Sequence, residues 1–242
     1  FSLNRQNKSR KIFQKNVFLV IFSRISVVFP NFSPQKWRFM QEKTQGVVLR
    51  TLKYNDNSLI VDIYTAIRGT VSFMVKLPKS RKAALKGVFF RPLSILEIDF
   101  DYRQKSALQR IRDVRFKYVY QTLPYDPRKS SMALFLAEFL CRVLKHEEGS
   151  DTLFSYILYS LQWLDASGEG FSNFHLVFLT RLTRFLGFYP NVEEWHKGDC
   201  FDMVEACFVS SSPSRHAYLE PQEADLIPLF MRMNYDTMRF FA

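Results

Sequence analysis

The sequence predicts an α+β protein in which an N-terminal, five-stranded OB-type β-barrel is followed by an α-helical domain. Residues 44–118 contain five short stretches rich in β-branched and aromatic residues, with no long helical pattern between them. From Arg128 onward, apolar residues recur at three and four positions instead. Pro124 and Pro127 interrupt both patterns, so we expect an OB domain at residues 40–125 and a helical domain at 126–242.

The strand signals are clearest in two places. Residues 96–102 alternate, so that Leu96, Ile98, Phe100 and Tyr102 share one face, because successive strand side chains point to opposite sides. The residues between them are acidic and face the other way: Glu97, Asp99 and Asp101. Residues 58–67 and 70–77 flank a turn at Gly69 and predict a hairpin.

Two further strands are predicted within residues 91–120. One strand is predicted to begin near Arg91. The last strand, residues 108–120, mixes apolar and cationic residues, which predicts one apolar and one cationic side. The apolar residues are Val114, Phe116 and Tyr118, and the cationic residues are Arg110, Arg112, Arg115 and Lys117.

Three helices are predicted to pack as a bundle after the boundary. The first carries an apolar stripe over residues 132–144 and ends near Gly149. The second, residues 152–164, has Asp151 as its expected N-cap, and the third runs from Ser172 to residue 186 before Gly187. The members of the first stripe are Met132, Phe135, Leu136, Phe139, Leu140, Val143 and Leu144.

The end of the chain gives weaker signals. Residues 191–221 lose periodicity and predict an irregular insertion. A last helix is expected from Pro221, with Pro228 bending or ending it. The sequence stops within an amphipathic segment without a C-cap, so we expect the helical domain to be truncated at its C-terminus.

Charge is distributed unevenly over the 242 residues, whose formal net charge is +11. Residues 1–39 carry +8 without a single acid, residues 40–125 carry +9, and residues 126–242 carry −6. A basic barrel is typical of proteins that bind polyanions, since neutralising phosphates releases condensed counterions. Residues 1–39 precede the first methionine, Met40, and are interpreted as a non-native leader or a disordered extension; a targeting segment is the alternative.

Catalytic and metal-binding signatures are absent from the sequence. There is no GxSxG, GxxxxGK[ST], HExxH or GxGxxG motif, so we expect no enzyme and no cofactor. Cys141, Cys200 and Cys207 match neither a CxxC pair nor an extracellular disulfide framework, which indicates free thiols in a reducing compartment. Cys200 and Cys207 lie near His196, but three ligands without a fourth are poor support for a zinc site.

Several segments resemble a known family. The sequence Gly46-Val47-Val48-Leu49-Arg50, the hairpin through Gly69, and Arg91-Pro92-Leu93 are similar to the N-terminal OB domain of the bacterial RecO family. Residues 179–191, which include Leu186-Gly187-Phe188-Tyr189-Pro190, resemble the family's Leu-Gly-Tyr/Phe-x-Pro signature. The resemblance covers residues 40–190 and, more faintly, the remainder.

The resemblance implies a DNA repair and recombination mediator. Such a protein binds single- and double-stranded DNA, anneals complementary strands, contacts the acidic tail of single-stranded-DNA-binding protein, and with RecR helps load RecA. It implies a bacterial cytoplasmic, nucleoid-associated location and no membrane contact. Many family members carry four zinc-binding cysteines after the proline signature, whereas this chain has only Cys200 and Cys207 there, so we expect no metal site.

The predicted DNA contacts are electrostatic, with stacking as an addition. We expect cations of the barrel, above all those between Lys76 and Arg91, to hold phosphates, and exposed aromatic residues to stack on bases. The predicted DNA-binding residues are Arg50, Lys53, Tyr54, Lys76, Lys79, Arg81, Lys82, Lys86 and Arg91. Phe73 is a further stacking candidate, for which a place in the hairpin core is the alternative.

A partner site is predicted on the first helix. Arg142 and Lys145 lie on the face opposite its apolar stripe and would offer local cations to an acidic peptide with an apolar end. Two other functions stay open: a protein–protein adaptor that uses a groove of the helical domain, and an RNA-binding OB module.

Overall fold

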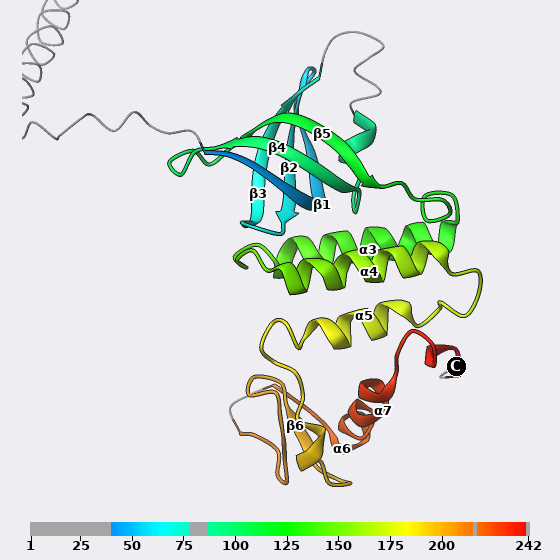
Figure 1. Cartoon of the computed structure of the whole chain (residues 1–242). Coiled ribbons are helices and arrows are strands. Elements are labelled where there is room, and N and C mark those ends of the chain that lie inside the picture. Colours follow the sequence, from blue (N-terminus) through cyan, green and yellow to red (C-terminus); the bar gives the residue numbers. More distant parts are fainter. Residues whose placement is uncertain (1–39, 78–86, 215–216, 241–242) are drawn as a thin grey trace, which may run out of the picture. The chain divides into compact units, whose positions relative to one another are not determined.

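The structure is a computed structural model that describes residues 40–77, 87–214 and 217–240 (Figure 1). The expected leader, residues 1–39, lies outside the described residues, as do the last two residues of the expected truncated end. Residues 41–242 form one compact unit.

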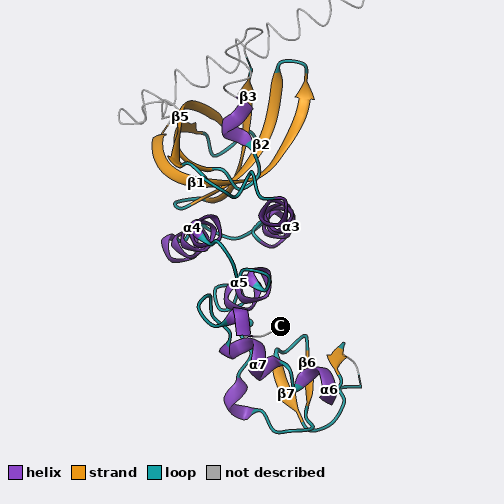
Figure 2. Cartoon of the chain, turned by 90° about the vertical axis from the view of Figure 1, so that its right-hand side faces the viewer, coloured by secondary structure: helices purple, strands orange, loops and turns teal. Residues whose placement is uncertain are grey.

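Five antiparallel strands form the N-terminal sheet (Figure 2). They are β1 (Met40–Asn55), β2 (Ser58–Thr65), β3 (Gly69–Lys76), β4 (Ile95–Tyr102) and β5 (Arg110–Tyr118), in the order β3-β2-β1-β4-β5. Gln109 joins the two outer strands, because its amide donates to the Ser72 carbonyl at 2.9 Å and its carbonyl accepts from the Met74 amide at 2.9 Å. The α+β class with an OB-type N-terminal sheet is confirmed.

The sheet has two buried faces. Val48, Ile63, Phe73 and Phe100 fill the inside of the curved sheet together with the other residues of the first core. The outer face packs on the helices through a second core. Val47, Leu49, Tyr64 and Ile95 of the sheet belong to this core, as does Leu93 just before β4. The predicted alternation in β4 is confirmed, since Leu96, Ile98 and Phe100 are buried.

Turn geometry sets the strand ends. Gly69 has φ +67°, a conformation that glycine adopts without steric cost, and the predicted hairpin turns just before it. Gly69 is itself the first residue of β3, one residue earlier than predicted. The strand expected from Arg91 begins only at Ile95. Leu93 is the reason, because its φ of 61° is incompatible with an extended strand. A 3₁₀ helix, η1 (Val88–Phe90), precedes it.

Three helices follow the barrel: α3 (Pro127–Val143), α4 (Asp151–Ala166) and α5 (Phe174–Leu182). Figure 1 shows α3 and α4 against the sheet, with α5 on their other side. The three predicted helices exist, but α3 ends before residue 148 and α5 before residue 186. The predicted N-cap Asp151 is wrong, since Ser150 Oγ accepts from the Leu153 amide at 3.3 Å.

Two further details of the helices differ from the expectation. Asn173 rather than Ser172 precedes α5, without a side-chain cap. Phe135 was placed in the apolar stripe of α3, but 47% of it is exposed. Leu136, Leu140 and the small residues Ala133 and Ala137 form the buried face instead, because small side chains let α3 approach its neighbours closely.

Residues 191–226, called the C-terminal module below, contain regular structure where the sequence predicts an irregular insertion. A three-stranded sheet of order β7-β6-β8 is built from β6 (Cys200–Asp202), β7 (Cys207–Val209) and β8 (Tyr218–Leu219). Strands of two or three residues are too short to produce a periodic signal. The 3₁₀ helix η2 (Val192–Glu194) and helix α6 (Pro221–Ala224) complete the module.

The chain closes with α7 (Ile227–Arg232) and the 3₁₀ helix η3 (Met238–Phe240). Pro228 lies in the first turn of α7, so it starts a helix rather than ending one. Met233 and Met238 then join the core that α3, α4 and α5 share. None of the helices in the described ranges is long and apolar enough to cross a membrane.

Candidate nucleic-acid interface

The strand register gathers three of the predicted DNA-binding residues at one end of the barrel. Lys53 and Tyr54 lie at the β1–β2 turn, and Lys76 lies opposite Ser58, the first residue after that turn. The amide of Leu77 donates to a carbonyl of the same turn at 2.8 Å. The chain therefore enters the basic segment 78–86 from this end, which we call the hairpin tip (residues 52–58 and 76–77).

Tyr54 is the aromatic residue that the hairpin tip offers to solvent. Lys53 lies opposite Leu59 and Asn55 opposite Ser58, so Tyr54 is the extra residue of a β-bulge. The bulge leaves 62% of Tyr54 exposed. An exposed ring beside cations has the geometry on which a base can stack.

The cations near the tip differ in how firmly they are paired. Lys53 Nζ lies 3.0 Å from Asp56 Oδ1, and both side chains are exposed, so this pair contributes little and opens easily. Arg50 donates two hydrogen bonds to Asp62 Oδ2, from Nε at 3.0 Å and from Nη2 at 2.8 Å. Asp62 is buried and also accepts from Ser72 Oγ. The bond to Asp62 raises the pKa of Arg50, and a phosphate would have to share a guanidinium that is already engaged.

The centre of the predicted site lies outside the described residues: Lys79, Arg81, Lys82 and Lys86. The residues on either side of segment 78–86 lie within the described ranges. Lys76 at the end of β3 and Arg91 after η1 are both exposed. Thr51 Oγ1 donates to the carbonyl of Phe90 at 2.7 Å, which holds the second flank beside β1.

Phe73 is not available to a base. It is fully buried, and its ring meets that of Phe100 edge-on at 5.1 Å. The alternative reading, a core residue of the hairpin, is the correct one, because Phe73 belongs to the face of β3 that points into the curved sheet.

The cationic side predicted for the last strand exists, but three of its four cations pair with acids of β4. A β-bulge at Arg112 shifts the register of β5, so that both Ile111 and Val114 pack toward the core while the cations stay outside. Arg112 Nε lies 2.9 Å from Asp101 Oδ1. Glu97 contacts both Arg115, with Nε at 2.6 Å, and Lys117 at 3.5 Å. Its hydrogen bond to Arg115 is the main cause that lowers the pKa of Glu97.

A cleft of about 770 Å³ lies between the barrel and α3. Arg142 and Lys145, the predicted partner-peptide residues, line it together with Arg50. Glu138 pairs with Arg142 at 2.7 Å, and both side chains are largely exposed. Leu134 contributes an exposed apolar side chain to the same cleft. Sequence reasoning assigned Arg50 and Arg142 to different sites, and only the tertiary structure brings them together.

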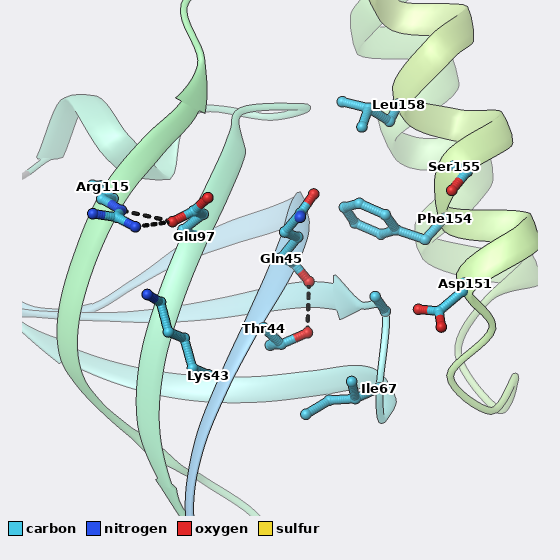
Figure 3. Close-up of a pocket in the computed structure, with 11 residues that line it drawn as sticks. Lys43, Thr44, Gln45, Ile67, Glu97, Arg115, Asp151, Phe154, Ser155 and Leu158 are labelled. Atoms are coloured by element: carbon cyan, nitrogen blue, oxygen red, sulfur yellow. Dashed lines mark hydrogen bonds and ion pairs between the residues drawn. The ribbon is translucent and has the colours of Figure 1, made fainter.

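A second cleft, of about 440 Å³, lies between the barrel and α4 (Figure 3). Lys43 and Arg115 supply cations from the strands, while Ile67, Phe154 and Leu158 supply apolar surface. The sequence contains no signal for this site, because its residues come from five separate segments between Lys43 and Leu158 that no local pattern connects.

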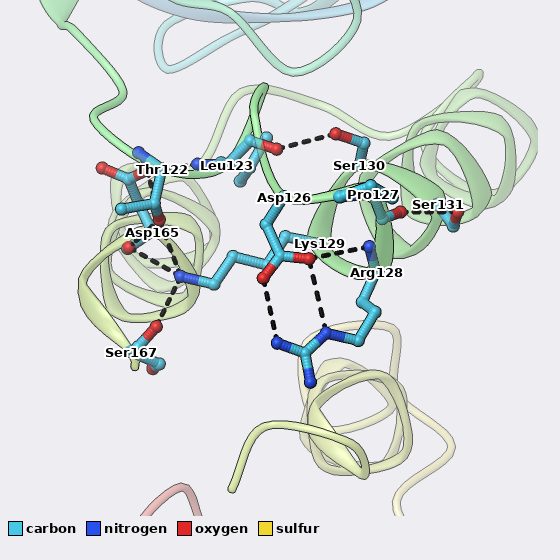
Figure 4. A network of polar contacts seen from close by, with 10 residues as sticks. All are labelled: Thr122, Leu123, Asp126, Pro127, Arg128, Lys129, Ser130, Ser131, Asp165 and Ser167. Carbon is cyan, nitrogen blue, oxygen red and sulfur yellow. Dashed lines mark hydrogen bonds and ion pairs between the residues drawn. The ribbon is translucent and has the colours of Figure 1, made fainter. Parts of the chain in front are cut away.

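The link between the barrel and the helices is fixed by a buried polar network (Figure 4). The carboxylate of Asp165, only 1% exposed, accepts hydrogen bonds from the amides of residues 121–123 at 2.7–2.9 Å and from Tyr118 Oη at 2.9 Å. Lys129, also buried, donates to Thr122 Oγ1 at 2.7 Å and to the carbonyls of Asp165 and Ser167. A lone acid in the apolar pattern of α4 is the one signal in the sequence that could have indicated it.

Burial and hydrogen bonding act in opposite directions on this network. Burial by itself raises the pKa of Asp165, but the hydrogen bonds from the amides of residues 121–123 outweigh it and hold that pKa below its usual range. For Lys129, burial dominates and lowers the pKa. Asp165 is thus an ionised structural group that orients the segment between β5 and α3.

Family comparisons agree with this architecture over almost all of the described chain. The model of the family described as "Recombination protein O N terminal" matches residues 40–120, which hold the five-stranded sheet. The model described as "Recombination protein O C terminal" matches residues 124–241, which hold the helices and the C-terminal module.

Curated relatives share long alignments with the chain. A DNA repair protein RecO from Phocaeicola vulgatus is 55% identical over 203 residues, which cover 84% of this chain and 84% of the relative. The protein of the same name from Bacteroides fragilis is 49% identical over 204 residues, with the same coverage. One from Flavobacterium johnsoniae is 35% identical over 198 residues, covering 81% and 82%. The chain therefore belongs to the RecO family of DNA repair proteins.

Proposed function

We propose that the chain is a recombination mediator that binds single- and double-stranded DNA at the hairpin tip and along the segment from Lys76 to Arg91. It anneals complementary strands and, with RecR, helps load RecA onto DNA covered by single-stranded-DNA-binding protein. The proposal includes no chemical step, no cofactor, and a bacterial cytoplasmic, nucleoid-associated location.

One observation carries the DNA site. The register of β1, β2 and β3 brings Lys53, Tyr54 and Lys76 together where the basic segment begins. Lys53 pairs with Asp56, which is itself exposed, and Lys76 is exposed at the end of β3. By contrast, three cations of β5 pair with Glu97 and Asp101, namely Arg112, Arg115 and Lys117. A cation that already pairs with a partly buried carboxylate, as on β5, must give up that pair to bind a phosphate, so the tip is the preferred contact.

Annealing follows from the same chemistry. Two complementary strands repel each other through their phosphates, and a cationic surface that neutralises both lowers that repulsion. Tyr54 adds stacking, which is worth about 1–3 kcal/mol per base and tolerates any sequence. A mediator of this kind needs affinity without base specificity, and the hairpin tip supplies both contacts.

Fluorescence anisotropy with a labelled single-stranded oligonucleotide, repeated over a salt series, tests the site. Each lost contact to a single strand lowers the slope of log K against log salt by about 0.7. We expect Lys53→Ala/Lys76→Ala to lower it by about 1.4, and replacement of Lys79, Arg81, Lys82 and Arg91 by alanine to lower it by about 2.8.

The matched control is Lys197→Ala/Arg232→Ala, which removes the same charge from exposed positions away from the barrel. Its salt slope is expected to equal that of the natural chain. Equal slopes for all variants would refute the hairpin tip as the DNA site. A preference for RNA over DNA of the same sequence would instead support the RNA-binding alternative.

The cleft beside α3 is the proposed site for the acidic tail of single-stranded-DNA-binding protein. Arg50, Arg142 and Lys145 surround apolar surface from Leu134 there, which suits a peptide with carboxylates next to an apolar end. The same cleft favours the adaptor as a second candidate function. Parallel titrations with a labelled tail peptide and with labelled DNA separate the two, because an adaptor binds the peptide without binding nucleic acid.

A further inference from the structure

The C-terminal module occupies the place where the family resemblance implies a zinc site. Tetrahedral zinc sites need four ligands from Cys, His or carboxylate side chains. Cys200 lies opposite Val209 and Cys207 opposite Asp202, so the two thiols stand at opposite ends of the β6–β7 ladder. Among the residues that the structure describes, no three His, Cys, Asp or Glu side chains gather in a way that could hold a metal ion. The donor set therefore does not fit the metal.

An aromatic pair fills the centre of the module. Phe201 and Phe208 lie directly opposite each other on β6 and β7, with ring centroids 5.1 Å apart in an edge-on arrangement. Both are buried together with Ala224 of α6. Trp195 and Leu219 are among the partly buried residues that pack against them. The pair connects strands and helix by apolar contact, without ligands.

A single carboxylate oxygen fastens the loop before β6 to the end of α6. Asp225 Oδ1 accepts from Trp195 Nε1 at 3.2 Å and from the amide of Gly198 at 3.4 Å. These donors lie 30 and 27 positions earlier in the chain. Gly198 has φ +96°, a conformation that residues with a side chain rarely adopt, and this turn aims its amide at Asp225.

We propose that the C-terminal module of this chain folds without a metal ion, held by the Phe201–Phe208 pair and by the Asp225 clamp on Trp195 and Gly198. Structural zinc joins segments that are distant in sequence, and its removal unfolds the modules that depend on it. In this chain the clamp joins Trp195 and Gly198 to the end of α6, and the aromatic pair packs on Ala224 of the same helix, so distant segments are joined without a metal ion and chelation leaves the module intact.

Alkylation of the three cysteines by N-ethylmaleimide, read by peptide mapping, tests the proposal on the full chain. Cys200 is buried in β6 and reacts only when the module opens, whereas Cys141 lies on α3 and reports on the rest of the molecule. The natural chain is measured with and without EDTA, and its zinc content is determined by mass spectrometry. The variants are Asp225→Ala, Asp225→Asn and, as a control of equal charge change in the same module, Glu193→Ala.

We expect no stoichiometric zinc and the same Cys200 rate with and without EDTA. Asp225→Ala should accelerate Cys200 alkylation roughly ten- to a hundredfold, since it leaves the Trp195 donor without its partner, and should leave Cys141 nearly unchanged. Asp225→Asn keeps the acceptor oxygen and should stay close to the natural chain, as should Glu193→Ala. One zinc per chain whose removal exposes Cys200 would overturn the metal-free module. The clamp would be overturned if Asp225→Ala reacted no faster at Cys200 than the natural chain, or if Asp225→Asn reacted as fast as Asp225→Ala.

Discussion

Removal of the Asp165 carboxylate should weaken the whole fold, because this buried group accepts hydrogen bonds from the backbone amides of three consecutive residues. Asp165→Ala leaves the amides of residues 121–123 and the hydroxyl of Tyr118 without an acceptor. It also removes the negative charge nearest to the buried ammonium of Lys129. An unsatisfied buried donor costs about 1–3 kcal/mol, but the terms are not additive when water enters. Breaking a buried charged network typically costs about 3–5 kcal/mol in total.

That loss is large against the total stability of a typical protein, about 5–15 kcal/mol. With an m value of about 3 kcal/mol per molar, the urea midpoint should fall by about 1–2 M. Circular dichroism and tryptophan fluorescence report the midpoint. Asp56→Ala is the matched control, since its pair with Lys53 is exposed and contributes less than about 1 kcal/mol. A midpoint for Asp165→Ala equal to that of Asp56→Ala would refute a structural role for the network.

The same carboxylate predicts a dependence on acid. Its pKa is lower in the folded state than the unfolded value of about 3.9. A depressed folded pKa stabilises the protein above the unfolded value, and the contribution is lost as the pH falls through the folded value. Asp165→Asn lacks this term, so below about pH 4 its stability should fall less steeply than that of the natural chain.

Three further predictions concern the proposed binding residues and the turn before β3. Tyr54→Ala should weaken single-stranded DNA binding by about 1–3 kcal/mol at unchanged melting temperature, whereas Phe73→Leu should lower the melting temperature and keep the salt slope. Gly69→Ala should lower the melting temperature in calorimetry, because its Cβ would lie 2.0 Å from the Glu147 carbonyl oxygen, while Gly168→Ala, with open space around it, should not. Arg142→Ala/Lys145→Ala should weaken binding of the labelled acidic tail peptide several-fold in anisotropy and leave DNA affinity unchanged; equal loss of both would place peptide and DNA on one surface.

The strands and helices were predictable where patterns are long. Residues 96–102 of β4 alternate between apolar and acidic side chains, and α3 spans 17 residues with a sustained apolar face. The predictions were wrong where only a few residues determine the start of an element or form the whole element. Leu93 delays the start of β4 through its positive φ, and the three strands of the C-terminal module are too short to show a period. Such features depend on tertiary contacts rather than on local preference.

The positive charge of the candidate site was predictable from the sequence, but the ion pairs that its cations form were not. Composition indicates a basic barrel, but it cannot tell that Arg112, Arg115 and Lys117 are matched by acids on β4, because those pairs depend on register. Lys53 and Lys76 were chosen for charge alone, and it is the register that brings them to one end of the sheet. Lys129 and Asp165 were missed because a buried ion looks like an ordinary surface residue in a sequence.

The orientation of the Arg50 side chain depends on a single β-bulge in β1. Strict alternation in β1 would place Arg50 on the side of Val48, inside the curved sheet, where an ion has no partner. Leu49 is an extra residue in the ladder, since Val48 lies opposite Ile63 and Arg50 opposite Asp62. The bulge thereby turns Arg50 to the other face, where it meets Asp62 and the cleft beside α3. Because the Asp62 carboxylate is buried and already holds it, Arg50 can extend the cationic rim of that cleft without leaving its partner. The exposed pair of Lys53 with Asp56 is held far less firmly, which is why the proposed phosphate contacts are assigned to the hairpin tip.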